Sequence, residues 1–229
     1  MPLEIGLLLF PRLTQLDLTG PYEVFAKFPD AKVRLVWKDV GPVVADGGMA
    51  IISDTSFAGC PQLDVVCIPG GPGTNALLDD AETLEFIRRQ SLHAKYVTSV
   101  CTGALILGAA GLLRGKRATT HWMSHDMLAE FGAIPTRGRV IRDGNVLTGG
   151  GVTAGIDMAL TLAAEVMGPR AMALELLMEY DPAPPHGTGA PEKAAPGIVE
   201  GVRRATAGMQ SERLAAVQRA AARLNLRSS

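Results

Sequence analysis

Short apolar runs alternate with helix-length amphipathic stretches along most of the sequence, and this alternation constrains the fold more than any other feature. Strands that are apolar on both faces need helices on both faces, which is the arrangement of a parallel sheet in an α/β protein. The pattern predicts strands at 3–10, 32–37, 49–52, 64–68, 96–100, 139–142 and 146–148. It predicts helices at 20–28, 81–91, 102–110, 124–131, 153–167, 171–178 and 199–226. Asp143-Gly144, between the last two strands, is a strong hairpin signal.

The length and composition favour one main domain with a C-terminal extension. The chain has 229 residues, 47% of them apolar, which is enough to bury one sizeable core. The segment 182–196 is rich in Pro, Gly and Ala, so we predict a main domain over 1–181 and a linker and helix over 182–229. That helix cannot bury its apolar stripe alone. We expect it to pack on the main domain or on the second subunit of a homodimer.

Charge and hydropathy exclude several classes of protein. The 22 Lys and Arg residues nearly balance 23 Asp and Glu, so the net charge of −1 offers no general attraction for nucleic acid or anionic membranes. The apolar N-terminal run lacks the basic region and cleavage site of a secretory signal. The apolar region 146–167 is interrupted by glycines and carboxylates, so it is not expected to span a membrane. We expect a cytoplasmic protein that binds neither nucleic acid nor membranes.

The three cysteines, Cys60, Cys67 and Cys101, are too few and too far apart for a disulfide scaffold or a CxxC site. Cys101 stands alone between the strand-like run YVTSV and the helical stretch TGALILGAAGLL. A cysteine at such an elbow points out at the carboxyl edge of the sheet, where α/β proteins bind ligands. Spacing alone leaves Cys101 as either a nucleophile or a small buried side chain. We expect Cys60 and Cys67 to be structural.

Backbone amides around Cys101 are candidates for stabilising negative charge. The helix that begins at Thr102 directs free N–H groups at the sulfur, which favours the thiolate. We expect the amides of Gly71 and Thr102 to form an anion-stabilising hole. Gly150, within the glycine loop 149–151, lets that loop press against a ligand or the sulfur. The Thr102 hydroxyl either orients a water molecule or belongs to an ordinary helix start.

Asp17 places a carboxyl group in apolar surroundings just after the first predicted strand. A buried carboxyl with a raised pKa can hold a proton and deliver it, so Asp17 is a candidate general acid/base. An ordinary helix N-cap is the alternative that the local sequence favours. Glu23 is a rival, which we expect to be a solvated helix residue.

Two further motifs are typical of cofactor sites but fit them poorly. His121 and His125 have the i, i+4 spacing that lets two imidazoles share a metal ion, yet no third ligand is evident. The glycines from Gly71 match a dinucleotide fingerprint on paper, but Pro72 removes an N–H and no acidic residue follows at the required distance. We expect neither a metal ion nor another cofactor.

Four ordered motifs and a glycine loop resemble the ThiJ/PfpI cysteine superfamily. They are Asp17-Leu-Thr-Gly-Pro-Tyr-Glu-Val-Phe, Pro69-Gly-Gly, Val100-Cys-Thr-Gly-Ala, Ala118-Thr-Thr-His-Trp and the loop 149–157. The match extends over about residues 1–180. It implies a flavodoxin-like three-layer α/β sandwich, similar to glutamine amidotransferases, with a mostly parallel sheet. It also implies a homodimer, a nucleophile at Cys101 and an acidic partner at Asp17.

Other branches of the superfamily often have histidine directly after the cysteine, whereas this chain has Thr102, which argues against a peptidase-like Cys-His pair. The chain is most similar to members that hydrate isonitriles. That resemblance implies that the Cys101 thiolate attacks a small neutral isonitrile while Asp17 supplies a proton. Water then releases an N-substituted formamide from the thioimidate, without a cofactor. The alternative is a non-catalytic ligand- or redox-sensing domain, related to those of AraC-type regulators.

Overall fold

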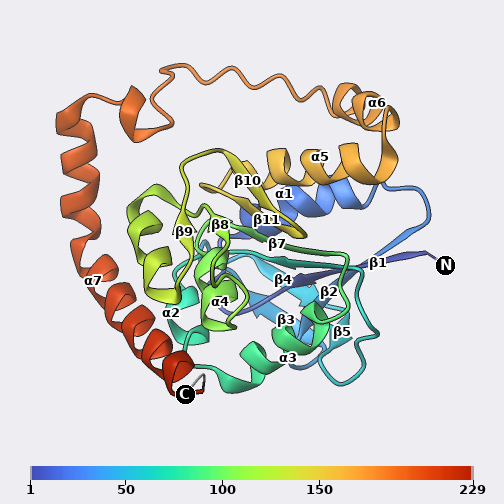
Figure 1. Cartoon of the computed structure of the whole chain (residues 1–229). Coiled ribbons are helices and arrows are strands. Elements are labelled where there is room, and N and C mark those ends of the chain that lie inside the picture. The colour runs from blue at the N-terminus through green and yellow to red at the C-terminus, as the bar shows by residue number, and fades with distance from the viewer. Residues whose placement is uncertain (1, 228–229) are drawn as a thin grey trace.

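A seven-stranded sheet forms the centre of the computed structural model, which describes residues 2–227 (Figure 1). Its strands lie in the order β10-β11-β7-β6-β1-β2-β5, and every neighbouring pair is parallel except the β10–β11 hairpin. The bounds are β1 Leu3–Leu8, β2 Ala31–Trp37, β5 Thr55–Ser56, β6 Val65–Ile68, β7 Tyr96–Val100, β10 Val140–Asp143 and β11 Val146–Gly149. The predicted hairpin is confirmed, and Gly144 adopts the positive φ of 62° that its turn requires.

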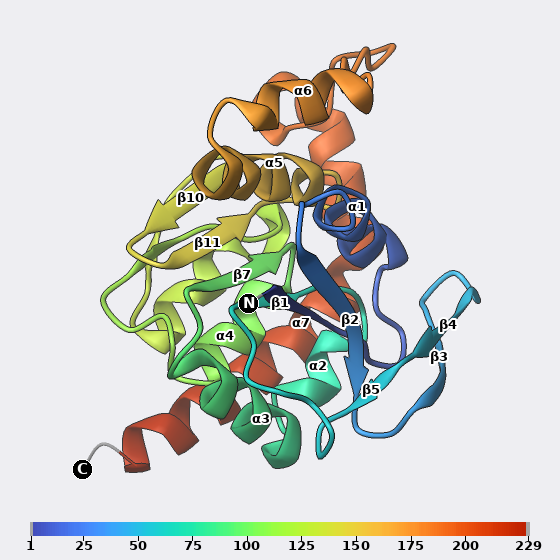
Figure 2. The ribbon, with the colours of Figure 1, turned by 90° about the vertical axis from the view of Figure 1, so that its right-hand side faces the viewer.

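Helices cover both faces of this sheet, which confirms the predicted three-layer sandwich (Figure 2). The helices α1 and α5 pack together on one face, and α6 follows α5. On the other face lie α2, α3, α4 and the 3-10 helix η1. The bounds are α1 Gln15–Phe25, α2 Thr74–Leu77, α3 Ala81–Ser91, α4 Gly103–Ala109, η1 Trp122–Phe131, α5 Ala154–Met167 and α6 Arg170–Leu177.

Two small sheets lie beside the main one. The strands β3 (Gly41–Val44) and β4 (Ala50–Ser53) form an antiparallel pair, and β8 (Arg117–Ala118) pairs with β9 (Ile134–Pro135) in parallel. The strand predicted at 49–52 therefore exists, but it pairs outside the main sheet.

The C-terminal helix α7 (Pro196–Arg227) packs on η1, α2 and α4 of its own chain. An exposed linker, with the short 3-10 helix η2 (Pro191–Lys193), connects it to α6. The buried face of α7 includes Ala216, Val217, Ala220 and Ala221. None of the helices described over residues 2–227 is long and apolar enough to cross a membrane.

The first helix begins earlier than we predicted. We expected it to start at Gly20, because proline is tolerated in a first helical turn. The helix α1 starts instead at Gln15 and carries Pro21 inside it. Leu18, in the turn that precedes Gly20, is buried in the core, and this burial outweighs the hydrogen bond that Pro21 cannot donate.

Gly103 marks a close approach between α4 and the end of β6. A Cβ atom there would overlap the Ile68 carbonyl oxygen and would lie 2.8 Å from the Pro69 carbonyl oxygen. We expect Gly103→Ala to lower the free energy of unfolding by about 2 kcal/mol, because backbone has to move on both sides. Urea unfolding followed by circular dichroism measures this loss.

Gly208→Ala is the matched control. Gly208 lies within α7, and no atom lies within 4 Å of the position its Cβ would take. Alanine there should stabilise the protein by up to about 1 kcal/mol, through helix propensity alone. Equal stabilities of the two variants would contradict the close approach at Gly103.

Candidate active site

Cys101 occupies a strained elbow between β7 and α4. Its φ of 54° lies in the left-handed region, which non-glycine residues rarely adopt. The Cys101 N–H donates to the Gly149 carbonyl at 3.1 Å, and the Cys101 carbonyl accepts from Thr120 Oγ1 at 2.6 Å. Both backbone groups of the elbow are therefore held by segments that follow it in the sequence.

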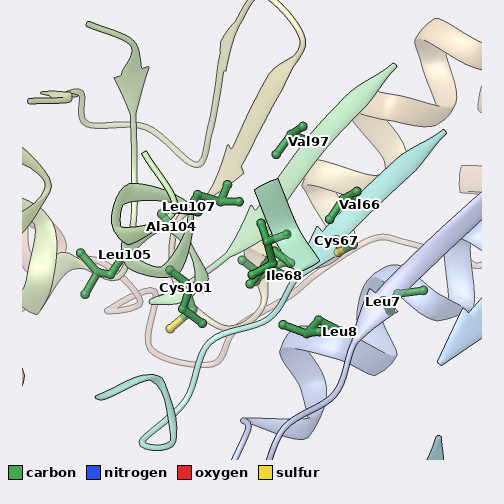
Figure 3. Close-up of a cluster of buried hydrophobic side chains, with 14 of the residues drawn as sticks. Leu7, Leu8, Val66, Cys67, Ile68, Val97, Cys101, Ala104, Leu105 and Leu107 are labelled. Atoms are coloured by element: carbon green, nitrogen blue, oxygen red, sulfur yellow. The ribbon is translucent and has the colours of Figure 1, made fainter. Parts of the chain in front are cut away.

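The two other cysteines have different surroundings. Cys67 lies within β6 among buried apolar side chains, whereas Cys101 lies where β7 turns into α4 (Figure 3). Burial raises the pKa of Cys67 to about 12 and that of Cys60 to about 11. Cys67 lies inside a strand and Cys60 in a loop, so neither sulfur lies at a strand-to-helix elbow like that of Cys101.

Asp17 lies in the first turn of α1 and is fully buried beside Cys101. Its Oδ2 accepts a hydrogen bond from the Gly70 N–H at 2.9 Å, while Oδ1 has no donor of regular geometry among residues 2–227. The N-cap position belongs to Thr14, so the N-cap alternative for Asp17 is wrong. The α1 start at Gln15 turns the carboxyl towards Gly70 and Cys101 instead of towards its own helix end.

Burial raises the pKa of Asp17 to about 7, and the Gly70 N–H and the Cys101 thiol only partly offset this. Burial and the Asp17 charge also raise the pKa of Cys101 well above its usual range, against the Thr102 N–H and the positive charge of Arg213. The Thr102 N–H at the helix start does favour the thiolate, as we expected, but burial and Asp17 outweigh it in the resting site. Because the two acids lie so close, they titrate as one pair, and that pair keeps a proton at neutral pH.

Thr102 lies in a closed network. Its Oγ1 accepts from the Gly71 N–H at 3.0 Å and lies 2.9 Å from Thr74 Oγ1, with the side chain buried. The Gly71 amide is thus already bonded and does not form half of an anion hole, which corrects our prediction. The Thr102 hydroxyl is likewise engaged internally, so it is poorly placed to orient water.

Gly150 does not offer a free amide either. Its N–H donates to the Arg139 carbonyl at 2.9 Å, which anchors the glycine loop to the segment before β10. The role predicted for Gly150 beside a ligand therefore cannot use this amide. The backbone donor that remains at the sulfur is the Thr102 N–H.

The histidine pair does not assemble a metal site. Within residues 2–227, no group of three His, Cys, Asp or Glu side chains could hold a metal ion. His121 is largely buried, and its pKa is lowered to about 4 by burial and by Arg213. Its Nδ1 accepts from the Met123 N–H at 3.4 Å, so His121 caps the start of η1 as a neutral side chain.

Sequence reasoning missed Arg213, which reaches the site from α7. Its Nε donates to Asn75 Oδ1 at 3.0 Å, Nη1 to Ser124 Oγ at 3.3 Å and Nη2 to the Gly71 carbonyl at 3.4 Å. One signal could have found it. Arg213 lies three, four, seven and eight positions before Ala216, Val217, Ala220 and Ala221, and this spacing marks one buried helix face.

Fold and site together define an α/β protein with a cysteine elbow at the carboxyl edge of a parallel sheet, beside a buried carboxyl group. Residues 4–165 match the DJ-1/PfpI family, and the chain belongs to this family.

Three known proteins illustrate the similarity. An isonitrile hydratase from Pseudomonas putida is 55% identical over 228 residues, which cover 99% of this chain and 100% of that protein. A THiJ/PfpI family protein from Pseudomonas syringae has a crystal structure with a TM-score of 0.92 and 43% identity, covering 95% of this chain and 91% of that one. The HTH-type transcriptional regulator CdhR from Pseudomonas aeruginosa is 31% identical over 134 residues, 58% of this chain and 40% of the regulator.

The raised pKa of Asp17 makes stability depend on pH. Folding favours the protonated carboxyl, so this group lowers the free energy of unfolding as pH rises from about 4 to about 7, by on the order of 4 kcal/mol at most. Asp17→Asn removes this titration and keeps an oxygen for the Gly70 N–H. We expect the variant to gain stability over the original chain across that pH range, measured by urea unfolding.

Glu23→Gln is the control for this experiment. Glu23 lies on the same helix with an exposed side chain, 2.8 Å from Lys27, so the variant removes a carboxylate without removing a buried one. A stability difference between Asp17→Asn and the original chain that stays constant with pH would contradict the raised pKa.

Proposed function

We propose that this protein hydrates isonitriles to N-substituted formamides through a thioimidate on Cys101, as a cofactor-independent hydro-lyase. The observation that carries the proposal is the buried Asp17 carboxyl beside the elbow cysteine, because such a pair can hold one proton and transfer it. The identity of 55% with an isonitrile hydratase over 99% of the chain supports the same reaction.

The first step joins Cys101 to the substrate. The thiol proton passes to Asp17 as the sulfur attacks the terminal carbon of R–N≡C. Asp17 then gives this proton to the same carbon, so the product is R–N=CH–S–Cys101 and no atom is lost or gained. A carboxyl with a pKa of about 7 suits both transfers at neutral pH.

The second step releases the formamide. Water adds to the imidate carbon, with one of its protons going to nitrogen, and forms R–NH–CH(OH)–S–Cys101. The C–S bond then breaks, and the hydroxyl proton returns through Asp17 to the sulfur as R–NH–CHO leaves. We assign the activation of this water to Asp17, because the Thr102 hydroxyl is engaged by Gly71 and Thr74. Thr102 contributes through its backbone N–H, which favours negative charge on the sulfur.

A second copy of the chain is the macromolecular partner we propose. Support comes from four exposed apolar side chains on α5 and α6: Val166, Met172, Leu176 and Leu177. A symmetric interface through these helices would remove them from water.

A ligand- or redox-sensing role is the second candidate function, supported by the similarity to the regulator CdhR. Mass spectrometry of Cys101 separates the two functions. A carbon adduct after an isonitrile, together with turnover, supports the enzyme. Sulfenate or sulfinate after mild peroxide, without isonitrile turnover, supports the sensor.

Substitution of the pair tests the proposed reaction. We expect Cys101→Ala to abolish formamide production from a simple aromatic isonitrile, and Asp17→Asn to lower kcat by about a hundredfold or more, because the proton relay is lost. Absorbance of the isonitrile follows the reaction. Cys60→Ala is the control and should keep the original rate, since Cys60 is half-buried outside the site. Turnover by Cys101→Ala would refute the thioimidate route.

The pH profile tests the shared proton. The active state holds one proton on the Asp17–Cys101 pair, so kcat/KM should rise as the pH passes through about 7 and the second proton leaves the pair. Below that range Asp17 is protonated and cannot accept the thiol proton. Initial rates from about pH 5 to about pH 9 measure the profile. A rate that falls as pH approaches 7 from below would contradict this order of events.

A further inference from the structure

Arg213 is a buried cation without a carboxylate partner. Its side chain is only 3% exposed, and its three acceptors, Asn75, Ser124 and the Gly71 carbonyl, are all uncharged. No Asp or Glu of residues 2–227 forms an ion pair with it. A guanidinium group is rarely buried unless a negative charge compensates for the lost hydration.

The other arginines of α7 nearby are paired in the ordinary way. Arg219 and Arg223 both contact the Asp79 carboxylate, at 2.8 and 2.7 Å, and their side chains are about half exposed. These two contacts fasten α7 to the end of α2. Arg213 takes no part in this ion-pair cluster, and its own acceptors are uncharged.

The positive charge of Arg213 acts on two titratable groups of the site, Cys101 and His121. The attraction between the two groups lowers the pKa of the Cys101 thiol and raises the pKa of the Arg213 guanidinium. The same charge contributes to the lowered pKa of His121. When the sulfur becomes anionic, it supplies a negative charge that the three uncharged acceptors of the guanidinium do not.

A short chain of bonds also links Arg213 to the sulfur. Arg213 Nη2 donates to the Gly71 carbonyl, and the Gly71 N–H donates to Thr102 Oγ1. The Thr102 N–H in turn points at the sulfur of Cys101. These bonds connect the guanidinium to the residue whose N–H is the backbone donor at the sulfur.

We propose that Arg213 is a positioning residue for Cys101: through the Gly71 carbonyl it supports the hydrogen bond between Gly71 and Thr102, and it supplies the positive charge that stabilises the sulfur when it becomes anionic. This inference deepens the proposed function and rests on it for the reaction itself. The sulfur carries negative charge when it attacks the isonitrile and again when it leaves the formamide. Arg213 consequently acts on kcat more than on KM.

The test separates the effect of the positive charge of Arg213 from the effect of its side-chain volume. Arg213→Met removes the charge and keeps much of the volume, Arg213→Lys keeps the charge, and Arg219→Met is the control on the exposed side of α7. The first readout is the rate at which iodoacetamide alkylates Cys101, followed by mass spectrometry. We expect Arg213→Met to slow alkylation by about tenfold or more at neutral pH, Arg213→Lys to recover most of the rate, and Arg219→Met to match the original chain.

Melting curves of all variants show whether α7 stays attached. Arg213→Gln, which keeps hydrogen-bond donors without the charge, replaces Arg213→Met if the latter unfolds. Equal alkylation rates in the original chain and a folded neutral variant would overturn the proposal. If Arg213→Lys and the neutral variant lose the same fraction of the alkylation rate, the proposed role of the charge is overturned.

The second readout is isonitrile turnover. A fall in kcat with little change in KM in the neutral variant supports the proposal. An unchanged kcat contradicts it. If the original chain has no isonitrile activity, the proposed function fails, whereas the alkylation series still decides whether Arg213 supports the Cys101 thiolate.

Discussion

The burial of Asp17 beside Cys101 is the interaction on which the rest of the site depends. Desolvation disfavours the charged form of both acids, and their proximity makes a second negative charge costlier still. The pair therefore keeps a proton at neutral pH, and the sulfur holds a proton more tightly than the carboxyl does. A site of this kind needs no metal ion or histidine to move a proton, which is consistent with a threonine directly after the cysteine.

The surrounding fold maintains this arrangement at a cost in local strain. A cysteine with a left-handed backbone conformation persists only where neighbouring segments fix it. At Cys101 the Gly149 carbonyl and the Thr120 hydroxyl do so. Gly70 completes the arrangement, because a Cβ atom there would lie 2.6 Å from Thr102 Oγ1 and 3.0 Å from Asp17 Oδ2. The acid and the elbow can approach each other only because this position between them has no side chain.

Local features of the sequence predicted six of the seven strands of the main sheet, the hairpin and the elbow, since apolar runs and turn dipeptides act over a few residues. The two-residue strand β5 was missed because it is too short to give a pattern. The start of α1 was missed because burial of Leu18 in the core overrides the preference of Pro21 for a first turn. The roles predicted for the Gly71 and Gly150 amides failed for a similar reason. Their acceptors, the Thr102 hydroxyl and the Arg139 carbonyl, come from other parts of the chain, and spacing along the sequence carries no information about them.

The contacts of Arg213 also come from distant parts of the chain, so the sequence did not reveal them. They give the C-terminal helix a proposed role in the site. A resting site that favours the protonated sulfur has to stabilise an anionic sulfur twice in the proposed cycle. Among the described residues, the Thr102 N–H and Arg213 oppose the effect of burial and of Asp17 on the sulfur. Because Arg213 lies on α7, a boundary after residue 181 separates a linker and a helix from the sheet but cuts through the proposed site. The helix is then a component of the chemistry, held in place by Asp79 at its exposed side and by the Gly71 carbonyl at its buried side.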